Sequence, residues 1–534
     1  MSRPTPLRLP IEDLARLTRR SFLHRGSLAA AGLGLGAAAC KPVVEPSTAA
    51  VSGPWGTARP GGESVLLPDQ VRPDGVLELF LIGGLCPWDT FYVVPEYGAP
   101  TGGGNSGTMW WTFQNTFNSV PDFYTRCGGA GPLLLDPWAT DAAGAGVRLG
   151  AFLYPLRDRP DITSRMRMWV IRHDQGAHET AIPLTLCGHP QSSPRMASTP
   201  AHVQRFFEER RSAERLNPWT AVLYPGLSDL SALNGEAASA VGLHRGSARP
   251  LSLRFGAGGL SSDGLDRATV AQRRDALDAA VQGHVRRYEE RFRRIDTGER
   301  VRASAIDDFV AARLALGRSD VFLDLAGAGA FQGATGQECL DSSPADYTAM
   351  EFDLAVRMLT DPTEPLRWVT LVDGGLLPAT AGAAYDTHFA HVHQSSRNVV
   401  HTMKRLVASI NEPGENDPRK LDLERQTVLV TTEFGRTPYA VGDGLNHWAD
   451  GYVVMAIGGP FDEERSGIVG SIGESGIAGE WITPADFRAA MLLAQGIWPF
   501  NGESFAVGDV SANTLNEIEG ATYLREHVLG YPRT

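Results

Sequence analysis

Residues 427–461 read TVLVTTEFGRTPYAVGDGLNHWADGYVVMAIGGPF, in which two apolar, β-branched runs at 427–432 and 452–457 enclose a polar loop. Runs of this length and composition predict strands that are buried on both faces of a sheet. The first run leads directly into Glu433, so a carboxylate stands at the end of a buried strand. A buried carboxylate needs a cation or hydrogen-bond donors beside it. This stretch therefore predicts a covered sheet that presents ionisable groups at one edge.

The same kind of apolar run recurs along the chain, with helical patterns between the runs. The other runs that predict strands are residues 76–82, 166–172 and 366–372. The patterns that predict helices are residues 266–294, 301–316, 345–359, 391–410 and 484–496. Strands that alternate with helices in this way favour an α/β fold with a doubly wound, mainly parallel sheet. The region from about 200 to 340, rich in Arg and Ala, is predicted to be a mostly helical insertion in the sheet domain.

The charge of the chain argues against a nucleic-acid partner. The 534 residues carry 49 Lys and Arg against 61 Asp and Glu, which gives a formal net charge of -12 at pH 7. A surface with this excess of acids repels phosphate backbones. The length is sufficient for one large domain or for several smaller ones.

The first forty residues resemble an export signal. Residues 18–23 (TRRSFL) form a twin-arginine motif, and residues 26–39 form a short apolar run that is too short to span a bilayer as a helix. The run ends in AAAC at residues 37–40, which resembles a lipoprotein cleavage box. We expect the twin-arginine export machinery as a partner, a periplasmic or cell-envelope location and, if Cys40 is processed, a lipid anchor in the membrane.

This interpretation divides the chain into three parts. Residues 1–40 are the signal peptide, residues 41–74 a flexible linker rich in Pro, Gly, Ser and Ala, and residues 75–534 the sheet domain with its insertion. The alternative for the first part is an amphipathic start that is never cleaved.

Four cysteines lie beyond Cys40, at positions 86, 127, 187 and 339. Outside the cytoplasm they could form two disulfides in any of three pairings, between which the sequence does not choose. None belongs to a CxxC pair, which argues against a zinc knuckle or a redox motif. We expect them to be structural, either as disulfides or as buried free thiols.

Ionisable side chains follow the carboxyl ends of four predicted strands. In chain order they are Asp89, His178, Asp386, His388, Glu433, Arg436 and His447. Because the carboxyl ends of parallel strands meet at one edge of a sheet, these side chains are expected to lie close together. Carboxylates and imidazoles bind Zn, Mn, Mg and Ca, so we expect a site for one or two divalent metal ions.

Each of these residues also has a structural explanation. A single Asp or His near a strand end is often a helix cap or a loop hydrogen bond. Arg436 could neutralise Glu433, three residues before it, or clamp an oxyanion of a substrate. His391 and His393 lie close to His388 in the sequence, but they begin a predicted helix and are expected to be exposed or packed.

Taken together, these residues resemble the domain of unknown function 1501 family, which belongs to the alkaline-phosphatase-like superfamily with the sulfatases. The stretch 427–461 is similar to that family's strand, E-F-G-R-T-P sequence, loop and H-W pair. The sequence DTH at 386–388 is similar to its W-D-T-H, with Tyr in place of Trp, and residues 81–89 resemble its first strand and Gly-Gly turn. The resemblance covers most of residues 75–500 and matches the region 200–340 poorly.

The resemblance implies an alkaline-phosphatase-like fold and hydrolysis of a phosphate or sulfate ester. It also implies the ligands of one or two metal sites, which are Asp89 from the first strand, Asp386, His388, Glu433 and His447. Two features depart from the active enzymes, because Phe434 stands where they place a metal-binding His and no clear nucleophile is present. The candidate catalytic residues are His178, Thr90 and Arg436, with metal-bound water as the attacking group. The alternative is a catalytically silent protein that binds a small-molecule or anionic envelope ligand in the same cleft, or a structural protein of the envelope.

Overall fold

The computed structural model describes residues 54–97, 120–193, 195–214, 219–225, 250–256, 259–262, 335–343, 345–376, 384–439, 441–442, 444–501 and 503–532. All of them belong to one compact unit, residues 53–534. The export motif and the cleavage box predicted in the first forty residues lie outside the described residues.

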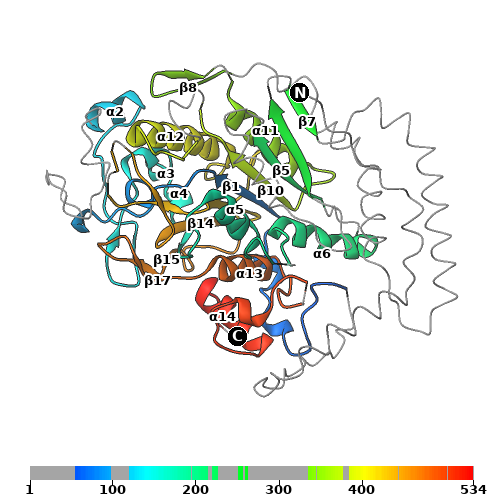
Figure 1. Ribbon diagram of the computed structural model, residues 1–534. Coiled ribbons are helices and arrows are strands. Elements are labelled where there is room, and N and C mark those ends of the chain that lie inside the picture. The colour runs from blue at the N-terminus through cyan, green and yellow to red at the C-terminus, as the bar shows by residue number, and fades with distance from the viewer. Residues whose placement is uncertain are drawn as a thin grey trace, which may run out of the picture. The chain divides into compact units, whose positions relative to one another are not determined.

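A nine-stranded sheet forms the centre of the domain (Figure 1). In spatial order its strands are β15 (Gly467–Val469), β4 (Met166–Ile171), β14 (Tyr452–Gly458), β11 (Gln426–Thr431), β1 (Gly75–Leu81), β10 (Trp368–Asp373), β5 (Thr220–Pro225), β6 (Leu251–Gly256) and β7 (Gly259–Ser262). β1 lies between β11 and β10 and is parallel to both, and β5 and β6 continue the parallel order. The predicted α/β fold with a mainly parallel sheet is therefore confirmed.

β14 departs from a purely parallel order, because it runs antiparallel to both of its neighbours, β11 and β4. The chain passes from β11 to β14 through a loop without a crossover helix, and such a connection joins antiparallel strands. Since β4 is antiparallel to β14, it points the same way as β11. The carboxyl ends of β1, β4, β10 and β11 therefore lie at one edge of the sheet, as the sequence predicts.

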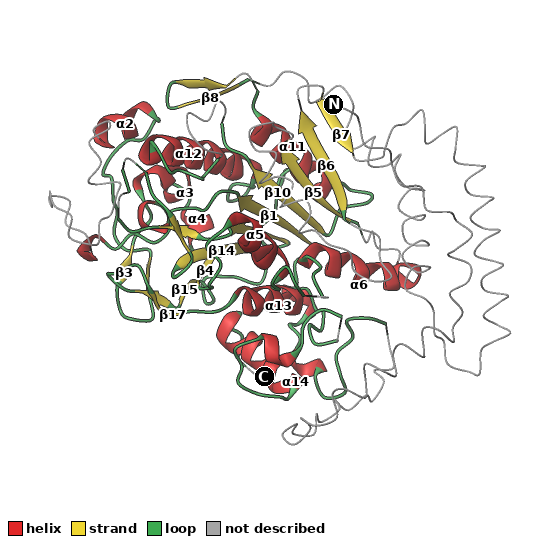
Figure 2. Cartoon of the chain, viewed as in Figure 1, coloured by secondary structure: helices red, strands yellow, loops and turns green. Residues whose placement is uncertain are grey.

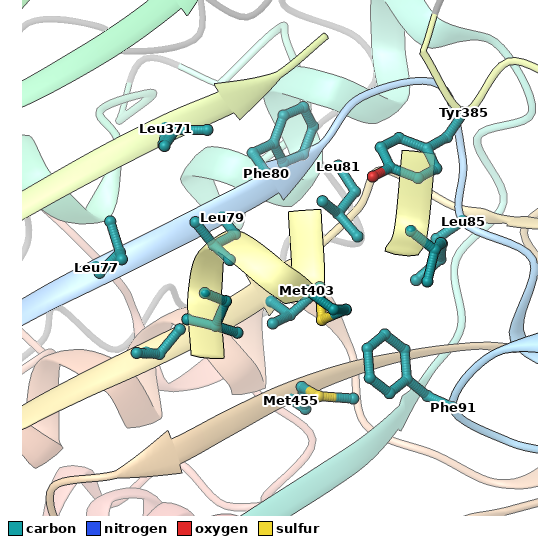
Figure 3. Close-up of a cluster of buried hydrophobic side chains, with 14 of the residues drawn as sticks. Leu77, Leu79, Phe80, Leu81, Leu85, Phe91, Leu371, Tyr385, Met403 and Met455 are labelled. Carbon is teal, nitrogen blue, oxygen red and sulfur yellow. The ribbon is translucent and has the colours of Figure 1, made fainter. Parts of the chain in front are cut away.

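Helices cover both faces of the sheet, which makes it doubly wound (Figure 2). Along β1, Leu77, Leu79 and Leu81 belong to one buried cluster and Val76 to a second, because successive side chains of a strand point to opposite faces. The first cluster includes residues of α11 (Tyr347–Thr360) and α12 (His391–Ser409); the second includes residues of α6 (Thr199–Glu214), α13 (Pro484–Ala494) and α14 (Glu517–Tyr523). Figure 3 shows Met403 of α12 among the leucines of the strands in the first cluster.

Polar caps fix the starts of two helices. Thr483 accepts a hydrogen bond from the N–H of Asp486, and the Asp486 carboxylate accepts one from the N–H of Thr483, which forms a capping box at the start of α13. The Asp346 side chain accepts a hydrogen bond of 2.9 Å from the N–H of Ala349 at the start of α11. These bonds satisfy N–H groups that the first turn of a helix leaves free. α11, α12 and α13 confirm the three helices predicted at these places.

The described part of the region 200–340 contains the helix α6 and also strands that the sequence did not predict. β5, β6 and β7 belong to the central sheet, and β8 (Gly336–Glu338) and β9 (Asp341–Ser343) form a separate hairpin. The strands were missed because the Arg- and Ala-rich composition of the region favours helix, whereas the short apolar run TAVLYP of β5 gains its stability from pairing with β10. The helices predicted at 266–294 and 301–316 lie outside the described residues.

Residues 54–74, predicted to be part of a flexible linker, instead belong to the domain. Two short 3-10 helices, Glu63–Val65 and Asp69–Val71, lead into β1, and Val65 and Leu67 are buried. Burial of these apolar side chains holds the segment against the domain. In the described part of the chain, no helix is both long enough and apolar enough to cross a bilayer.

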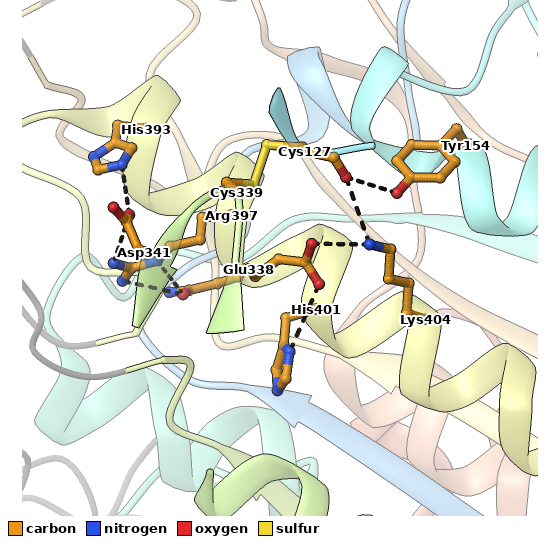
Figure 4. Close-up of a disulfide and its surroundings, with 10 residues drawn as sticks. Cys127, Tyr154, Glu338, Cys339, Asp341, His393, Arg397, His401 and Lys404 are labelled. Atoms are coloured by element: carbon orange, nitrogen blue, oxygen red, sulfur yellow. Dashed lines mark hydrogen bonds and ion pairs between the residues drawn. A yellow bond between two sulfur atoms is a disulfide. The ribbon is translucent and has the colours of Figure 1, made fainter. Parts of the chain in front are cut away.

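One disulfide and two buried thiols account for the four cysteines. Cys127 is disulfide-bonded to Cys339, whereas Cys86 and Cys187 are buried thiols. The bond joins the residue after α2 (Val120–Arg126) to the turn of the β8–β9 hairpin, 212 residues further along the chain (Figure 4). Beside it, Lys404 of α12 donates a hydrogen bond of 2.8 Å to the Glu338 carboxylate.

Candidate metal centre

Three imidazole rings converge on the carboxylate of Asp386. The Nε2 atoms of His178, His388 and His447 lie 3.5, 3.1 and 3.4 Å, respectively, from the same oxygen atom, Asp386 Oδ1. The Nε2 atoms of His388 and His447 are 3.1 Å apart. We call these four residues the histidine-aspartate cluster. All four were singled out from the sequence, and the structure brings them together.

The ends of three strands supply the cluster. His178 is the first residue of α5 (His178–Cys187), the helix after β4, and Asp386 and His388 lie in the loop between β10 and α12. His447 begins β13 (His447–Trp448), which pairs with β12 (Gly435–Arg436) just after β11. Because β4, β10 and β11 end at the same edge of the sheet, residues far apart in the sequence meet there.

An oxygen atom holds the second ring nitrogen of each histidine. His178 Nδ1 lies 2.8 Å from Glu433 Oε1, His388 Nδ1 lies 3.2 Å from Asn446 Oδ1, and His447 Nδ1 lies 2.7 Å from the carbonyl oxygen of Gly176. Since these oxygens accept hydrogen bonds, each Nδ1 donates its proton and the neutral ring keeps its lone pair on Nε2. Histidines that bind metals are oriented in the same way. The lone pairs that face Asp386 Oδ1 are neutralised either by a proton on one of the rings or by a cation that all three nitrogens bind.

The residues present fit a divalent transition metal. Three imidazole nitrogens and one carboxylate oxygen suit Zn and similar ions, whereas Ca and Mg prefer oxygen ligands. The Nε2 atom of His178 is buried without a well-formed hydrogen bond to any described residue, since its approach to Asp386 is long at 3.5 Å. The side chain of His388 is 37% exposed, so the cluster can be reached from solvent on that side.

The charges of the cluster favour a bound cation. Burial alone would lower the pKa of His178, but its interactions with the Asp386 and Glu433 carboxylates raise that pKa to about 9. Burial would raise the pKa of Asp386, yet contacts with His178, His447 and Arg436 hold the pKa of this carboxyl far below its usual range. In the metal-free protein a proton on His178 therefore neutralises Asp386, and a metal ion that binds here displaces that proton.

Arg436 is fully buried and holds the surroundings of the cluster in place. Its Nε donates to the carbonyl of Gly84 and its Nη1 to the carbonyl of Leu445, each at 3.1 Å. Its Nη2 donates to the carbonyl of Gly83 and to Asp386 Oδ1. Arg436 is hydrogen-bonded to Asp386, and the charges of both Asp386 and Glu433 act on it. Its guanidinium is buried, and its catalytic role as a clamp for a substrate oxyanion stays a prediction.

Glu433 lies behind His178 and outside the cluster. Its Oε1 accepts hydrogen bonds from the N–H of Gly83 and from His178 Nδ1, both at 2.8 Å, and its Oε2 accepts one of 3.2 Å from Thr432. The carboxylate is completely buried. In this structure donors satisfy the Glu433 carboxylate, which orients the ring of His178, and direct binding of a metal by Glu433 stays a prediction.

Asp89 and Thr90 also lie outside the cluster. Asp89 Oδ2 accepts a hydrogen bond of 2.8 Å from His391 Nε2, and Thr90 Oγ1 donates one of 2.5 Å to the carbonyl of Cys86. All these side chains are buried. Asp89 belongs to a separate group of possible metal ligands with Cys86 and His391, so its role as a ligand of one or two metal sites stays a prediction, as does the catalytic role of Thr90. The short 3-10 helix Pro87–Asp89 after the Gly-Gly turn carries Asp89 past the cluster into the core.

Sequence reasoning missed Asn446, Gly176 and His391 as neighbours of the site. Gly176 contributes only its carbonyl oxygen, for which residue type gives no signal. Asn446 directly precedes His447, and this adjacency was the one available signal. His391 was set aside because it begins a helix, yet the structure buries it completely.

The fold and the cluster define an α/β protein with a candidate transition-metal centre. No protein-family model matches the chain, and no curated protein matches it. Among solved structures, the crystal structure of the PsFucS1 sulfatase from Pseudoalteromonas sp. is similar, with 11% sequence identity over 82% of this chain and 72% of that chain, and a TM-score of 0.30. A likeness at this level carries no argument about function.

Proposed function

We propose that this chain binds a divalent transition-metal ion such as Zn or Mn through the histidine-aspartate cluster and hydrolyses a phosphate or sulfate ester there. The observation that carries the proposal is the convergence of three Nε2 atoms on Asp386 Oδ1 while each Nδ1 is held by an oxygen. Without a metal ion, a proton on His178 neutralises only one of these nitrogens, and the Nε2 atoms of His388 and His447 still face each other at 3.1 Å. With a cation, every lone pair has a partner.

The chain's own residues would hold the metal ligands in position. Glu433 fixes the ring of His178, and Arg436 fixes the carboxylate of Asp386. When bound at such a site, a divalent ion lowers the pKa of a coordinated water and polarises the oxygen of an ester. Zn sites expand to five ligands during reactions, so four protein ligands leave room for one oxygen of water or substrate.

Water, and not a protein hydroxyl or thiol, is the proposed nucleophile. Thr90 is hydrogen-bonded within its own turn, and the hydroxyl of Thr387 is 2.5 Å from His391 Nδ1. Burial, followed by the charge of Asp89, raises the pKa of the Cys86 thiol well above its ordinary value, which leaves the thiol neutral. These side chains are buried, so a substrate at the cluster would not meet them.

The charge of the loaded site supports an anionic substrate. A divalent ion and Arg436 together outweigh the carboxylates of Asp386 and Glu433, which leaves the site with a net positive charge. The catalytically silent alternative, a protein that holds an anionic ligand of the envelope, uses the same charge.

Exposed apolar side chains beside the cluster support a substrate with an organic ring. Phe389 directly follows His388 and is 58% exposed. Tyr439 is 39% exposed, and its ring lies 6.0 Å from that of Trp448, the residue after His447. Aromatic side chains that expose one face stack on aryl or sugar rings.

Metal analysis of the purified chain tests the proposal. We expect about one equivalent of Zn or Mn, and we expect Asp386→Ala and His447→Ala to lose it. The matched control is His393→Asn, because His393 lies on the same helix start as His391 but pairs with Asp341 at 2.7 Å. Retention of metal by both cluster variants would overturn the proposal.

Turnover separates the enzyme from the silent protein. The metal-loaded chain is incubated with aryl phosphate and aryl sulfate esters, and release of the phenol is followed. We expect hydrolysis of one ester class and its loss in Asp386→Ala. Stoichiometric metal without turnover of either class would favour the ligand-binding alternative.

Export to the cell envelope is part of the same proposal. It is supported by the twin-arginine motif at 18–23 and by the Cys127–Cys339 disulfide, since disulfides persist mainly in oxidising compartments. Fractionation of the producing cell tests it: replacement of Arg19 and Arg20 by Lys should leave the chain in the cytoplasm, and Cys40→Ser should release it from the membrane. The fraction that contains the wild-type chain shows whether the protein reaches the cell envelope.

A further inference from the structure

We infer that Asp89, His391 and Thr387 form a positioning relay that sets the two metal ligands of the loop 384–390. The inference rests on the proposed function, because it assigns a role toward the histidine-aspartate cluster to residues that lie outside it. None of the three residues touches the cluster through its own side chain in the distances above; they act through the backbone of the loop.

The relay is a continuous chain of hydrogen bonds. Asp89 Oδ2 is 2.8 Å from His391 Nε2, and His391 Nδ1 is 2.5 Å from Thr387 Oγ1. Because a carboxylate accepts, His391 Nε2 donates to Asp89. In the neutral ring Nδ1 then accepts the hydroxyl proton of Thr387. Both nitrogens of His391 are therefore used, and the ring has one orientation.

Thr387 stands between the two ligands that it would position. The side chains of Asp386 and His388 face the cluster, whereas that of Thr387 faces His391. The carbonyl oxygen of Thr387 also accepts a hydrogen bond of 3.1 Å from the N–H of Leu445. Thr387 is thus held from its side chain and from its backbone, so the residues on either side have little freedom to turn.

The three side chains of the relay are buried in the interior of the domain. Thr387 and His391 are 0% exposed and Asp89 is 3% exposed. Hydrogen bonds in such surroundings are stronger than in water, and breaking one leaves a buried polar group unsatisfied. The turn that carries Asp89 is pressed against Gly150, where an added Cβ would lie only 2.0 Å from the Asp89 carbonyl oxygen.

The backbone beside His391 supports the same conclusion. Ala390 has a φ of 45°, in the left-handed region that L-residues other than glycine seldom occupy. Such a conformation persists only where the surroundings over-determine it. The two hydrogen bonds of His391 supply that constraint at the point where the ligand loop enters α12.

A second metal site is the competing explanation for these residues. Ligand atoms of Cys86, Asp89 and His391 lie within 4.8 Å of one another. However, the relay satisfies both nitrogens of His391 without a metal, and a buried neutral thiol is a poor ligand. The number of metal equivalents per chain decides between the two explanations.

The test compares Thr387→Val, which keeps the shape of the side chain, with Thr387→Ser, which keeps the hydroxyl. For Thr387→Val we expect about 10- to 100-fold weaker Zn binding, as for other outer partners of metal ligands. We also expect faster hydrogen exchange of the amides at 384–390 in the metal-free chain. Thr387→Ser should restore both properties to wild-type values.

Two further variants complete the design. Asp89→Asn removes the charge at the far end of the relay, while its amide oxygen can still accept from His391 Nε2, so it should weaken Zn binding less than Thr387→Val does. His401→Gln is the matched control, because His401 also lies buried on α12 and pairs with a carboxylate, Asp346 at 2.8 Å, away from the cluster. It should leave Zn affinity and exchange at 384–390 unchanged.

The outcomes separate the relay from the proposed function. The relay would be wrong if Thr387→Val kept the Zn affinity and the hydrogen exchange at 384–390 of the wild-type chain. It would also be wrong if the wild-type chain bound a second metal ion that Asp89→Asn or Cys86→Ser removed. If the wild-type chain binds no metal, the proposed function is wrong, and hydrogen exchange at 384–390 still decides whether the relay holds the loop. Should Asp89→Asn fail to fold, the pair of Thr387 variants carries the test.

Discussion

Glu433 Oε1 lies 2.8 Å from His178 Nδ1, and the glutamate is completely buried while the histidine faces the cluster. The carboxylate therefore influences a metal ion only through the orientation and basicity of the His178 ring. A partner of this kind differs from a ligand in one measurable respect: its removal weakens metal binding without abolishing it.

We predict that Glu433→Gln raises the Kd for Zn by about 10- to 100-fold, because the amide oxygen still accepts from Nδ1 but carries no charge. The measurement is competition with a chelating dye. Glu179→Gln is the control, since Glu179 is the exposed neighbour of His178 and its replacement removes the same charge. Complete loss of Zn binding in Glu433→Gln would indicate that this residue is a direct ligand. An unchanged Kd for Zn would show that Glu433 has no role in metal binding.

We predict that Arg436→Met destabilises the metal-free chain by about 3 to 5 kcal/mol, because it leaves the buried side of Asp386 and three backbone carbonyls without their donor. Urea unfolding measures the change. For comparison, Arg425 pairs with Asp74 at the surface and is 67% exposed, so Arg425→Met should cost no more than about 1 kcal/mol. Equal costs for the two variants would contradict the buried role of Arg436.

The cluster could be predicted from the sequence to the extent that strand order determines it. His178, Asp386, His388 and His447 each follow a strand, and the common direction of β4, β10 and β11 brings them together. The hydrophobic pattern of the sequence predicts which strands are buried and where they end. In a mainly parallel sheet, those ends lie at one edge, where the four residues then meet.

The direction in which each side chain points could not be predicted. Glu433 and Asp89 stand at strand ends like the true members of the cluster, but one lies behind His178 and the other pairs with His391. Their placement depends on single turns, such as the 3-10 helix Pro87–Asp89, whose geometry no periodic pattern encodes. β5 was missed for a related reason, since a short strand gains its stability from neighbours and not from its own composition.

We predict that His401 stabilises the fold more at low pH than at high pH. Burial alone would lower the pKa of His401, but its hydrogen bonds with Asp346 and Glu338 raise it above the ordinary value. Because the folded-state pKa is raised, this stabilisation is fully present below the unfolded pKa of about 6.5 and is lost as the pH rises through the folded pKa. His401→Gln should therefore lower the free energy of unfolding more at pH 6 than at pH 9.

The experiment for His401 is urea unfolding of both chains with a chelator present, so that metal binding does not contribute. His527→Gln is the control, because His527 is exposed and its replacement should cost the same at both values of pH. A cost of His401→Gln that is equal at the two values, or larger at pH 9, would contradict the ion pair of this ring with Glu338, drawn in Figure 4, and its ion pair with Asp346.

We predict that reduction of the Cys127–Cys339 disulfide lowers the free energy of unfolding by roughly 2 to 5 kcal/mol, since the bond closes a long loop in the unfolded chain. The two residues are 212 positions apart, so the restriction on the unfolded state is large. The double variant Cys127→Ser/Cys339→Ser should unfold at the same urea concentration with and without a reductant, whereas the wild-type chain should unfold at a lower concentration when reduced. Cys187→Ser, which removes a buried thiol outside this disulfide, should keep the sensitivity to reductant. If reductant leaves the wild-type transition unchanged, the bond contributes nothing to stability, and the argument from this disulfide to an oxidising compartment loses its support.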